Sequence, residues 1–193
     1  MTFKKSPNFT VSTIPKIGYV IHGTLGNYEG AINWLCTAPN DRNPVSYSSS
    51  HYVISKLGDI TQLVLDKDIA WHAGTVSNPT DYAKSVLPKS LFGYKNPNET
   101  FIGIELEWFI GDTVTEAQYS AIKQVVSLGT VVKPIILSHK EIADYKADFS
   151  TADGKIDLSV SARVRNMIVL PVESPQVDKM AIKTQIINLI NQL

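Results

Sequence analysis

Cysteine is almost missing from this sequence: Cys36 is the only one among 193 residues. A single cysteine excludes an internal disulfide framework and any zinc site that is built from several cysteines. The sequence also has no apolar run of about 18 residues, the length at which a membrane-spanning helix becomes a candidate. Membrane insertion is therefore not expected.

An excess of charge of either sign is also missing, because 18 Lys and Arg residues balance 18 Asp and Glu residues. Nucleic acids and anionic membrane surfaces select basic proteins, so neither is expected as the main partner. Residues 1–8 lack the apolar stretch of a secretory signal. We therefore expect synthesis in the cytoplasm, followed by action there or by release along a route that the sequence does not encode.

The composition indicates one globular domain, with 44% hydrophobic and 19% charged residues in a chain long enough to bury a sizeable core. Residues 1–16 are polar and contain two prolines, so we expect a loose lead-in before a main domain over residues 17–170. Residues 171–193 begin as a linker and continue as an amphipathic helix. We expect this helix to pack back on the domain, with self-association or anchoring as alternatives.

Alternating apolar strands and amphipathic helices predict an α/β fold, with a mixed central β-sheet flanked by helices. Strands are predicted over residues 17–22, 50–54, 60–65, 101–108 and 135–139, and helices over residues 29–37, 116–132 and from Asp157 or Ser159 to Ile168. Asn27 and Thr115 are the expected N-caps of the first two helices. Residues 75–100 show weak periodicity, so we expect a long loop on the rim of a binding site.

Two of the predicted apolar strands end on a histidine. Residues 135–138 lead into His139, and residues 19–21 lead into His22. A polar loop with a lysine and then an aspartate follows His139, and its side chains can reach the same site. Two imidazoles and one carboxylate from three chain positions match an open catalytic zinc site, in which water takes the fourth position.

Several short motifs occur in a characteristic order. They are Ile21–Thr24, Ser50–Ile54, Ala70–Gly74, Ile102–Glu107 and Leu137–Ile142, with Lys146 and Asp148 downstream. This order resembles that of the zinc-dependent N-acetylmuramoyl-L-alanine amidases of the type-2 group. The group includes phage lysozyme-type amidases, bacterial anhydro-muropeptide amidases and the peptidoglycan recognition proteins. The resemblance covers about residues 17–170, and the ordered set is much more specific than any single motif.

The resemblance implies a type-2 amidase fold and a role for individual residues. His22, His139 and Asp148 correspond to the three protein ligands of the zinc ion. Lys146 corresponds to a lysine that helps to stabilise a developing oxyanion, and Glu105 to the catalytic glutamate of the recycling-type members.

The chain departs from the family pattern just after the third predicted ligand. The family's Lys-x-Asp-Pro-Gly ending is Lys-Ala-Asp-Phe-Ser over residues 146–150 of this sequence. The usual turn is therefore missing, and Asp144 and Asp153 remain alternatives to Asp148 as the third ligand.

Other polar and aromatic residues of the motifs have less specific roles. Thr24, Trp71 and His72 are expected on the substrate-binding side, although His72 could equally pack under Trp71. His51 is expected to be structural, as a buried imidazole that fixes neighbouring backbone. Trp34 is expected on the buried apolar face of the helix over residues 29–37, although it could also line the substrate groove.

The activity that the resemblance implies is hydrolysis of the amide bond between N-acetylmuramic acid and L-alanine in peptidoglycan or muropeptides. A lytic enzyme of phage or prophage type, acting on the cell wall after release, is slightly favoured. The alternatives are an anhydro-muropeptide recycling amidase that acts in the cytoplasm and a non-catalytic peptidoglycan-binding module. The sequence does not define the oligomeric state, and a monomer is the simplest expectation.

Overall fold

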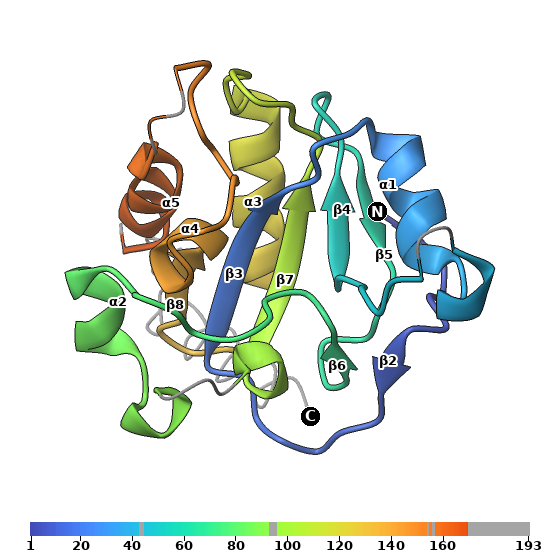
Figure 1. The fold of residues 1–193 in the computed structure, drawn as a ribbon, viewed down its shortest axis with the longest axis horizontal. Helices are drawn as coiled ribbons and strands as arrows, with labels where there is room; N and C mark the ends of the chain where they lie inside the picture. Colours follow the sequence, from blue (N-terminus) through green and yellow to red (C-terminus); the bar gives the residue numbers. More distant parts are fainter. Residues whose placement is uncertain (43–44, 93–95, 154, 156, 170–193) are drawn as a thin grey trace, which may run out of the picture.

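The computed structural model describes residues 1–42, 45–92, 96–153, 155 and 157–169. A six-stranded sheet with the order β1-β5-β4-β7-β3-β8 forms its centre (Figure 1). The strands are β1 Thr2–Phe3, β3 Gly18–Gly23, β4 Tyr52–Ile54, β5 Ile60–Gln62, β7 Phe101–Leu106 and β8 Ile135–Ser138. Two further strands, β2 Phe9–Thr10 and β6 Ile69–Ala70, form a separate antiparallel pair.

The sheet is mixed, as the sequence predicts. Strands β4, β7, β3 and β8 run parallel to one another, whereas β4 and β5 form the expected antiparallel hairpin. The helices are α1 Tyr28–Cys36, α2 Asp81–Val86, α3 Glu116–Leu128, α4 His139–Ile142 and α5 Ser159–Val169. Short 3₁₀ turns cover Pro39–Asp41, Lys89–Leu91 and Pro97–Glu99.

The helices cover both faces of the sheet because side chains alternate along each strand. Tyr19 and Ile21 of β3 belong to the buried cluster that contains α3 and α5 side chains. Val20 lies on the opposite face, in a cluster with residues of α2. Further along that face, Ile32 and Leu35 of α1 pack against the hairpin strands. The predicted α/β architecture is therefore confirmed.

Parallel pairing brings the carboxyl ends of β3, β7 and β8 to one edge of the sheet. In the register of these strands His22 lies opposite Glu105, and Ile21 lies opposite Ser138. The carboxyl edge of a parallel sheet is where α/β proteins place their ligand sites. Two of the predicted site residues, His22 and Glu105, are thus neighbours because of strand register alone.

The first residues of the chain are not the loose lead-in that their composition predicts. Thr2 and Phe3 pair with β5 and extend the sheet by one strand. Ser6 and Asn8 are buried, and their side chains donate hydrogen bonds to the Leu35 carbonyl at the end of α1. These long-range pairings have no local sequence signal, so the prediction was wrong.

Residues 75–100 are also not the long binding-site rim that weak periodicity predicts. Their described part contains α2 and two of the 3₁₀ turns. Ala83 and Leu87 are buried in the same cluster as Phe101 of β7. The Thr80 side chain accepts a hydrogen bond from the Ala83 amide and so caps α2. The segment packs against the sheet because its apolar residues are sufficient to cover that face.

Helix α3 ends earlier than predicted. The last helical residue is Leu128, which is 65% exposed, rather than a residue near Val132. A Cβ atom at Gly129 would lie 2.1 Å from the Tyr19 hydroxyl oxygen, so a larger residue here would have to displace the buried Tyr19 side chain. The predicted C-terminal helix within residues 171–193 lies outside the described residues.

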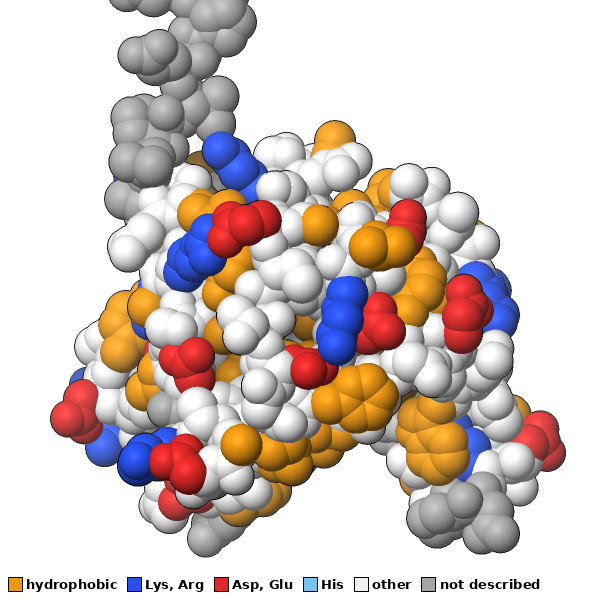
Figure 2. All heavy atoms as spheres, turned by 90° about the horizontal axis from the view of Figure 1, so that it is seen from above, with side chains coloured by type: hydrophobic (Ala, Val, Ile, Leu, Met, Phe, Trp, Pro, Cys, Tyr) orange, Lys and Arg blue, Asp and Glu red, His pale blue; other side chains and the backbone are white. Residues whose placement is uncertain are grey.

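Charged side chains of both signs are interspersed over the edge toward which the parallel strands point (Figure 2). The balanced composition is therefore mixed rather than segregated on this face. Within the described ranges, no helix has both the length and the apolar character needed to cross a membrane.

The N-cap of α3 offers a test of how the fold is held together. The Thr115 hydroxyl oxygen accepts a hydrogen bond from the Gln118 amide and also donates one to the Lys56 carbonyl. We expect Thr115→Val to lower the free energy of unfolding by about 1–2 kcal/mol, because both bonds are lost. Thr115→Ser, which retains the hydroxyl, should stay close to wild type in urea denaturation. Equal losses in the two variants would contradict this role of the hydroxyl.

Candidate metal centre and active site

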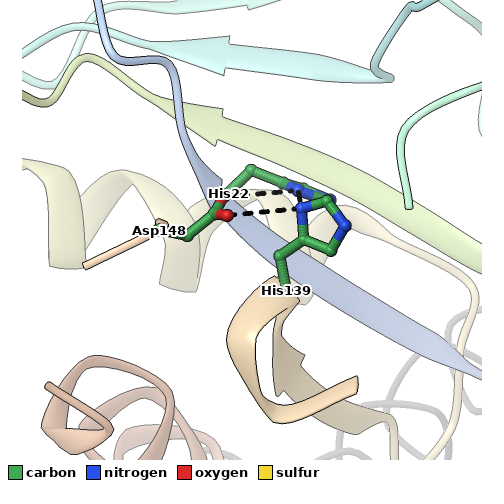
Figure 3. Close-up of side chains that lie close together, drawn as sticks. All are labelled: His22, His139 and Asp148. Carbon is green, nitrogen blue, oxygen red and sulfur yellow. Dashed lines mark hydrogen bonds and ion pairs between the residues drawn. The ribbon is translucent and has the colours of Figure 1, made fainter. Parts of the chain in front are cut away.

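Three predicted ligands lie together at the carboxyl edge of the sheet (Figure 3). The His22 and His139 Nδ1 atoms are 2.9 Å apart. The Asp148 carboxylate lies 3.7 Å from the first nitrogen through Oδ1 and 3.4 Å from the second through Oδ2. All three side chains are buried. The structure therefore brings this set of residues together from β3, α4 and the following loop.

A short helix, rather than a strand end followed by a loop, positions His139. His139 is the first residue of α4, and Ser138 with Glu141 forms a capping box at its start. The Glu141 carboxylate also accepts a hydrogen bond from Arg165 of α5 at 3.0 Å. The sequence does not predict this helix, because four residues are too few to show a helical hydrophobic period.

Asp148 is held by the strand that carries His22. Its Oδ1 atom accepts a hydrogen bond from the Gly23 amide at 3.1 Å. The next residue, Phe149, has a left-handed backbone with φ of 58°, and its buried ring packs against Trp108. A proline could not adopt this φ, so the missing Pro-Gly pair is replaced by a different turn.

The two alternative third ligands lie away from the histidines. Asp144 is exposed and accepts a hydrogen bond from the Asn78 side chain. Asp153 is exposed and forms an ion pair with Lys155. Of the aspartates that the sequence leaves open, only Asp148 lies beside His22 and His139.

The donor set and its spacing fit a zinc ion. Tetrahedral zinc bonds to nitrogen and oxygen of about 2.0–2.1 Å place neighbouring ligand atoms ~3.3 Å apart. The donor atoms of His22, His139 and Asp148 all lie within 4.8 Å of one another. Their individual separations of 2.9, 3.4 and 3.7 Å are close to the spacing that tetrahedral zinc requires. Two imidazoles and one carboxylate also leave a fourth position, as in catalytic zinc sites.

Burial and mutual proximity set the protonation of the group. Burial lowers the pKa of His22 to about 4, and the neighbouring His139 adds to this effect against the opposing influence of Asp148. Burial alone would raise the pKa of Asp148, whereas a facing imidazole that carries a proton on Nδ1 lowers it well below its ordinary value. At neutral pH the site therefore offers a neutral His22 and an ionised Asp148, the forms that bind metal.

Glu105 and Lys146 line the same cleft as the three predicted ligands. The cleft has a volume of about 530 Å³ and is also lined by Thr24, Leu25, Asn27, Trp34, Ser48 and His72. Burial raises the pKa of the Glu105 carboxyl to about 8, to which the nearby Asp148 contributes while Lys146 opposes the change. A carboxyl group with a pKa near neutrality is suited to accept and release a proton.

Of the three predicted substrate-side residues, His72 and Thr24 line the cleft and Trp71 does not. His72 lines the cleft, and its Nδ1 atom lies 2.9 Å from the His22 Nε2 atom. Thr24 also lines the cleft, but its hydroxyl is engaged by the backbone of Gly26 and Trp108. The Trp71 indole instead donates a hydrogen bond to the Thr10 hydroxyl of β2 and is not among the residues of the cleft.

His51 is buried in the sheet, whereas Trp34 lies at the cleft. His51 is structural as expected: its Nδ1 atom accepts a hydrogen bond from the Gly103 amide, and its Nε2 atom lies 3.1 Å from the Asp68 carbonyl. Trp34 does not belong to the buried face of α1, because it is 39% exposed and lines the cleft. Of the two positions that the sequence leaves open for Trp34, the structure therefore shows the one that lines the cleft.

The comparisons with known proteins agree with this site. Residues 15–151 match the protein family described as N-acetylmuramoyl-L-alanine amidase. The chain belongs to this amidase family. The match includes β3, β7, β8 and the loop with Asp148, so every residue of the buried group lies within it.

Two curated relatives match shorter parts of the amidase chain. N-acetylmuramoyl-L-alanine amidase A of Achromobacter lyticus is 35% identical over 69 residues, which are 35% of this chain and 36% of that protein. The 1,6-anhydro-N-acetylmuramyl-L-alanine amidase AmpD of Haemophilus influenzae is 34% identical over 100 residues, 49% of this chain and 47% of that protein. The matched region therefore spans less than half the length of either relative.

A solved structure shows the same fold as this amidase. The crystal structure of a selenomethionine derivative of AmpD has a TM-score of 0.59 and 23% sequence identity. The superposition covers 84% of this chain and 93% of that chain. The type-2 amidase fold that the sequence predicts is thus confirmed over most of the chain.

The raised pKa of Glu105 predicts a pH dependence of stability in zinc-free protein. Its carboxyl is protonated in the folded state up to about pH 8 but ionises from an ordinary value of 4.5 when unfolded. Stability should therefore fall as pH rises from about 5 to 8, since the folded state holds the extra proton. Because Glu105 is only half-buried, we expect Glu105→Gln to gain roughly 2 kcal/mol relative to wild type at pH 9 and almost nothing at pH 4.5.

The measurement is chemical denaturation of both proteins after chelator treatment at several pH values. Glu29→Gln, at an exposed site of α1, is the matched control and should show no such divergence. A constant difference between wild type and Glu105→Gln across the pH range would contradict the assignment.

Proposed function

We propose that this chain hydrolyses the amide bond between N-acetylmuramic acid and L-alanine in peptidoglycan or muropeptides, with a zinc ion held by His22, His139 and Asp148. One observation carries the proposal: the buried two-histidine, one-aspartate group shares a cleft with Glu105 and Lys146. Membership of the amidase family supports it.

The reaction requires a stronger nucleophile than water and a better leaving group than an amide nitrogen. A zinc ion with two imidazole ligands and one carboxylate ligand supplies a Lewis acid and makes water acidic near neutral pH. Glu105 faces the same cleft and, in its ionised form, takes the proton from the attacking water. It then gives this proton to the departing amine of L-alanine, the general acid–base role to which its raised pKa is suited.

Lys146 provides positive charge where the reaction creates negative charge. It lines the cleft two residues before Asp148, and its ammonium group lies 5.0 Å from the Tyr145 ring centroid. In the tetrahedral transition state the carbonyl oxygen becomes an oxyanion, which this ammonium group stabilises. Loss of one such group commonly costs about 3 kcal/mol of transition-state stabilisation.

The biological role within this activity has two candidates. The lytic role of phage or prophage type stays a prediction from the sequence. A cytoplasmic recycling role is favoured by the presence of Glu105 and by the similarity to the anhydro-muropeptide amidase of Haemophilus influenzae. A non-catalytic binding module is disfavoured, because a complete ligand set and two further polar residues share the cleft.

Zinc content tests the proposed ligands. We expect purified wild-type protein to bind one zinc ion per chain and Asp148→Ala to lose it, because two imidazoles alone hold zinc weakly. Asp144→Ala and Asp153→Ala are matched controls and should retain full occupancy. Atomic absorption after dialysis gives the stoichiometry. Retention of zinc by Asp148→Ala would show that the third ligand is misassigned.

Hydrolysis of two substrates tests the activity and separates the roles. Zinc-loaded protein is incubated with intact cell-wall sacculi and with soluble anhydro-muropeptides, and mass spectrometry identifies the bond that is cut. We expect release of stem peptides that begin with L-alanine, and a fall in kcat of roughly 10²–10⁴ for Glu105→Gln without loss of zinc. Cleavage of sacculi would support the lytic role, and cleavage of soluble fragments alone the recycling role. If zinc-loaded protein cuts neither substrate, the enzymatic proposal fails.

A further inference from the structure

Both predicted zinc histidines face the aspartate with the same ring nitrogen. The Nδ1 atoms of His22 and His139 point toward each other and toward Asp148 (Figure 3). A neutral imidazole carries one proton, so an Nδ1 atom can bind metal only when the proton is on Nε2. The structure must therefore favour the Nε2–H tautomer on both rings.

A backbone carbonyl selects the tautomer of His139. Its Nε2 atom lies 2.8 Å from the buried carbonyl oxygen of Ala73. A carbonyl oxygen only accepts hydrogen bonds, so this contact requires a proton on Nε2. The lone pair of His139 Nδ1 is then free and directed into the site.

Selection of the His22 tautomer requires one further step. The His22 Nε2 atom lies 2.9 Å from the His72 Nδ1 atom, and either ring could donate. The other nitrogen of His72 lies 3.2 Å from the Phe101 carbonyl oxygen, which can only accept. The His72 proton is therefore on Nε2 and its Nδ1 atom accepts, so His22 donates from Nε2 and keeps its Nδ1 lone pair for the metal.

One buried side chain fixes the backbone that supplies both contacts. The Asn98 Oδ1 atom accepts hydrogen bonds from the His72 amide at 3.2 Å and from the Ala73 amide at 2.8 Å. Asn98 is 5% exposed. Because His72 and Ala73 are adjacent, the Asn98 amide group controls the partners of both metal-facing histidines at once.

The neighbouring strand leaves space for the His72 ring. A Cβ atom at Gly103 of β7 would lie 2.5 Å from the His72 Cγ atom, which is closer than non-bonded carbon atoms approach. The ring of His51 also packs edge-on against His72, with a centroid distance of 5.8 Å. The position of His72 is thus defined by packing as well as by hydrogen bonds.

We propose that the His72-Ala73 segment, held by Asn98, sets the tautomers of both zinc histidines, and that His72 is a positioning residue rather than a substrate-binding one. The zinc part of this inference rests on the proposed function, whereas the tautomers can be measured without zinc. Partners of this kind typically contribute 10–100-fold to metal affinity, as order-of-magnitude values.

The first experiment compares His72→Leu, which removes the acceptor, with His72→Asn, whose side-chain oxygen can replace Nδ1. Zinc affinity is measured by competition with a chromophoric chelator. We expect a loss of roughly 10–100-fold for His72→Leu and recovery of most of it in His72→Asn. Equal affinities of wild type and a folded His72→Leu would overturn the proposal, as would equal losses in the two variants.

The second experiment reads the tautomers directly by ¹⁵N NMR of the imidazole rings in zinc-free protein at pH 9, where imidazoles are neutral. We expect wild-type His22, His72 and His139 to carry their protons on Nε2. In His72→Leu, His22 should become a mixture of tautomers, while His139 stays protonated on Nε2 because the Ala73 carbonyl remains.

The two experiments fail in distinguishable ways. A proton on Nδ1 of wild-type His22 or His139 would overturn the tautomer assignment even if every variant bound zinc normally. Conversely, a wild-type protein that binds no zinc but shows the expected tautomers would contradict the proposed function and leave the hydrogen-bond assignment intact. The wild-type spectrum decides the assignment even if His72→Leu does not fold.

Discussion

The pairing of β3 between β7 and β8 is the constraint on which the whole site depends. Parallel ladders on both sides bring three carboxyl ends to one edge, so His22, Glu105 and the start of α4 become neighbours without any loop having to fold back. Only the aspartate comes from a loop, and the Gly23 amide of β3 holds its carboxylate. The geometry of the centre is therefore set mainly by the pairing of the strands in the sheet.

Side chains alternate along β3, so that core residues lie on one face of the sheet and the candidate site residue lies on the other. Odd-numbered β3 residues such as Tyr19 and Ile21 pack under α3, whereas His22 emerges on the other face. A buried carboxylate that faces two lone pairs is unfavourable unless a cation lies between them. In the proposed metal-bound form a cation would lie between these groups, and the packed core beneath the sheet supports the arrangement.

Local patterns in the sequence predict most of the fold, whereas contacts between distant segments are beyond their reach. Asn27 and Thr115 cap α1 and α3 as their residue types predict, and His51 is structural as expected. The pairing of Thr2 and Phe3 with β5 joins segments nearly sixty residues apart and has no local signature. Trp71 and His72 are adjacent in one motif, yet only His72 faces the cleft, and no periodicity in a short loop decides this. The contacts of Asn98 could not be predicted from the sequence, because they join it to backbone amides about 25 residues away.

Gly103 illustrates how a residue without a side chain can constrain an active site. It contacts no substrate in the proposed reaction and lies inside a strand, where glycine contributes less to sheet stability than a β-branched residue would. Because glycine has no Cβ atom, the His72 ring can lie against the strand at this position. A mutagenesis library confined to cleft-lining positions would never sample it. A library scored on sheet propensity would replace it first, and the new side chain would displace the His72 ring while the strand itself remained. Engineering of this chain for stability therefore has to treat an apparently weak sheet position as part of the proposed metal site.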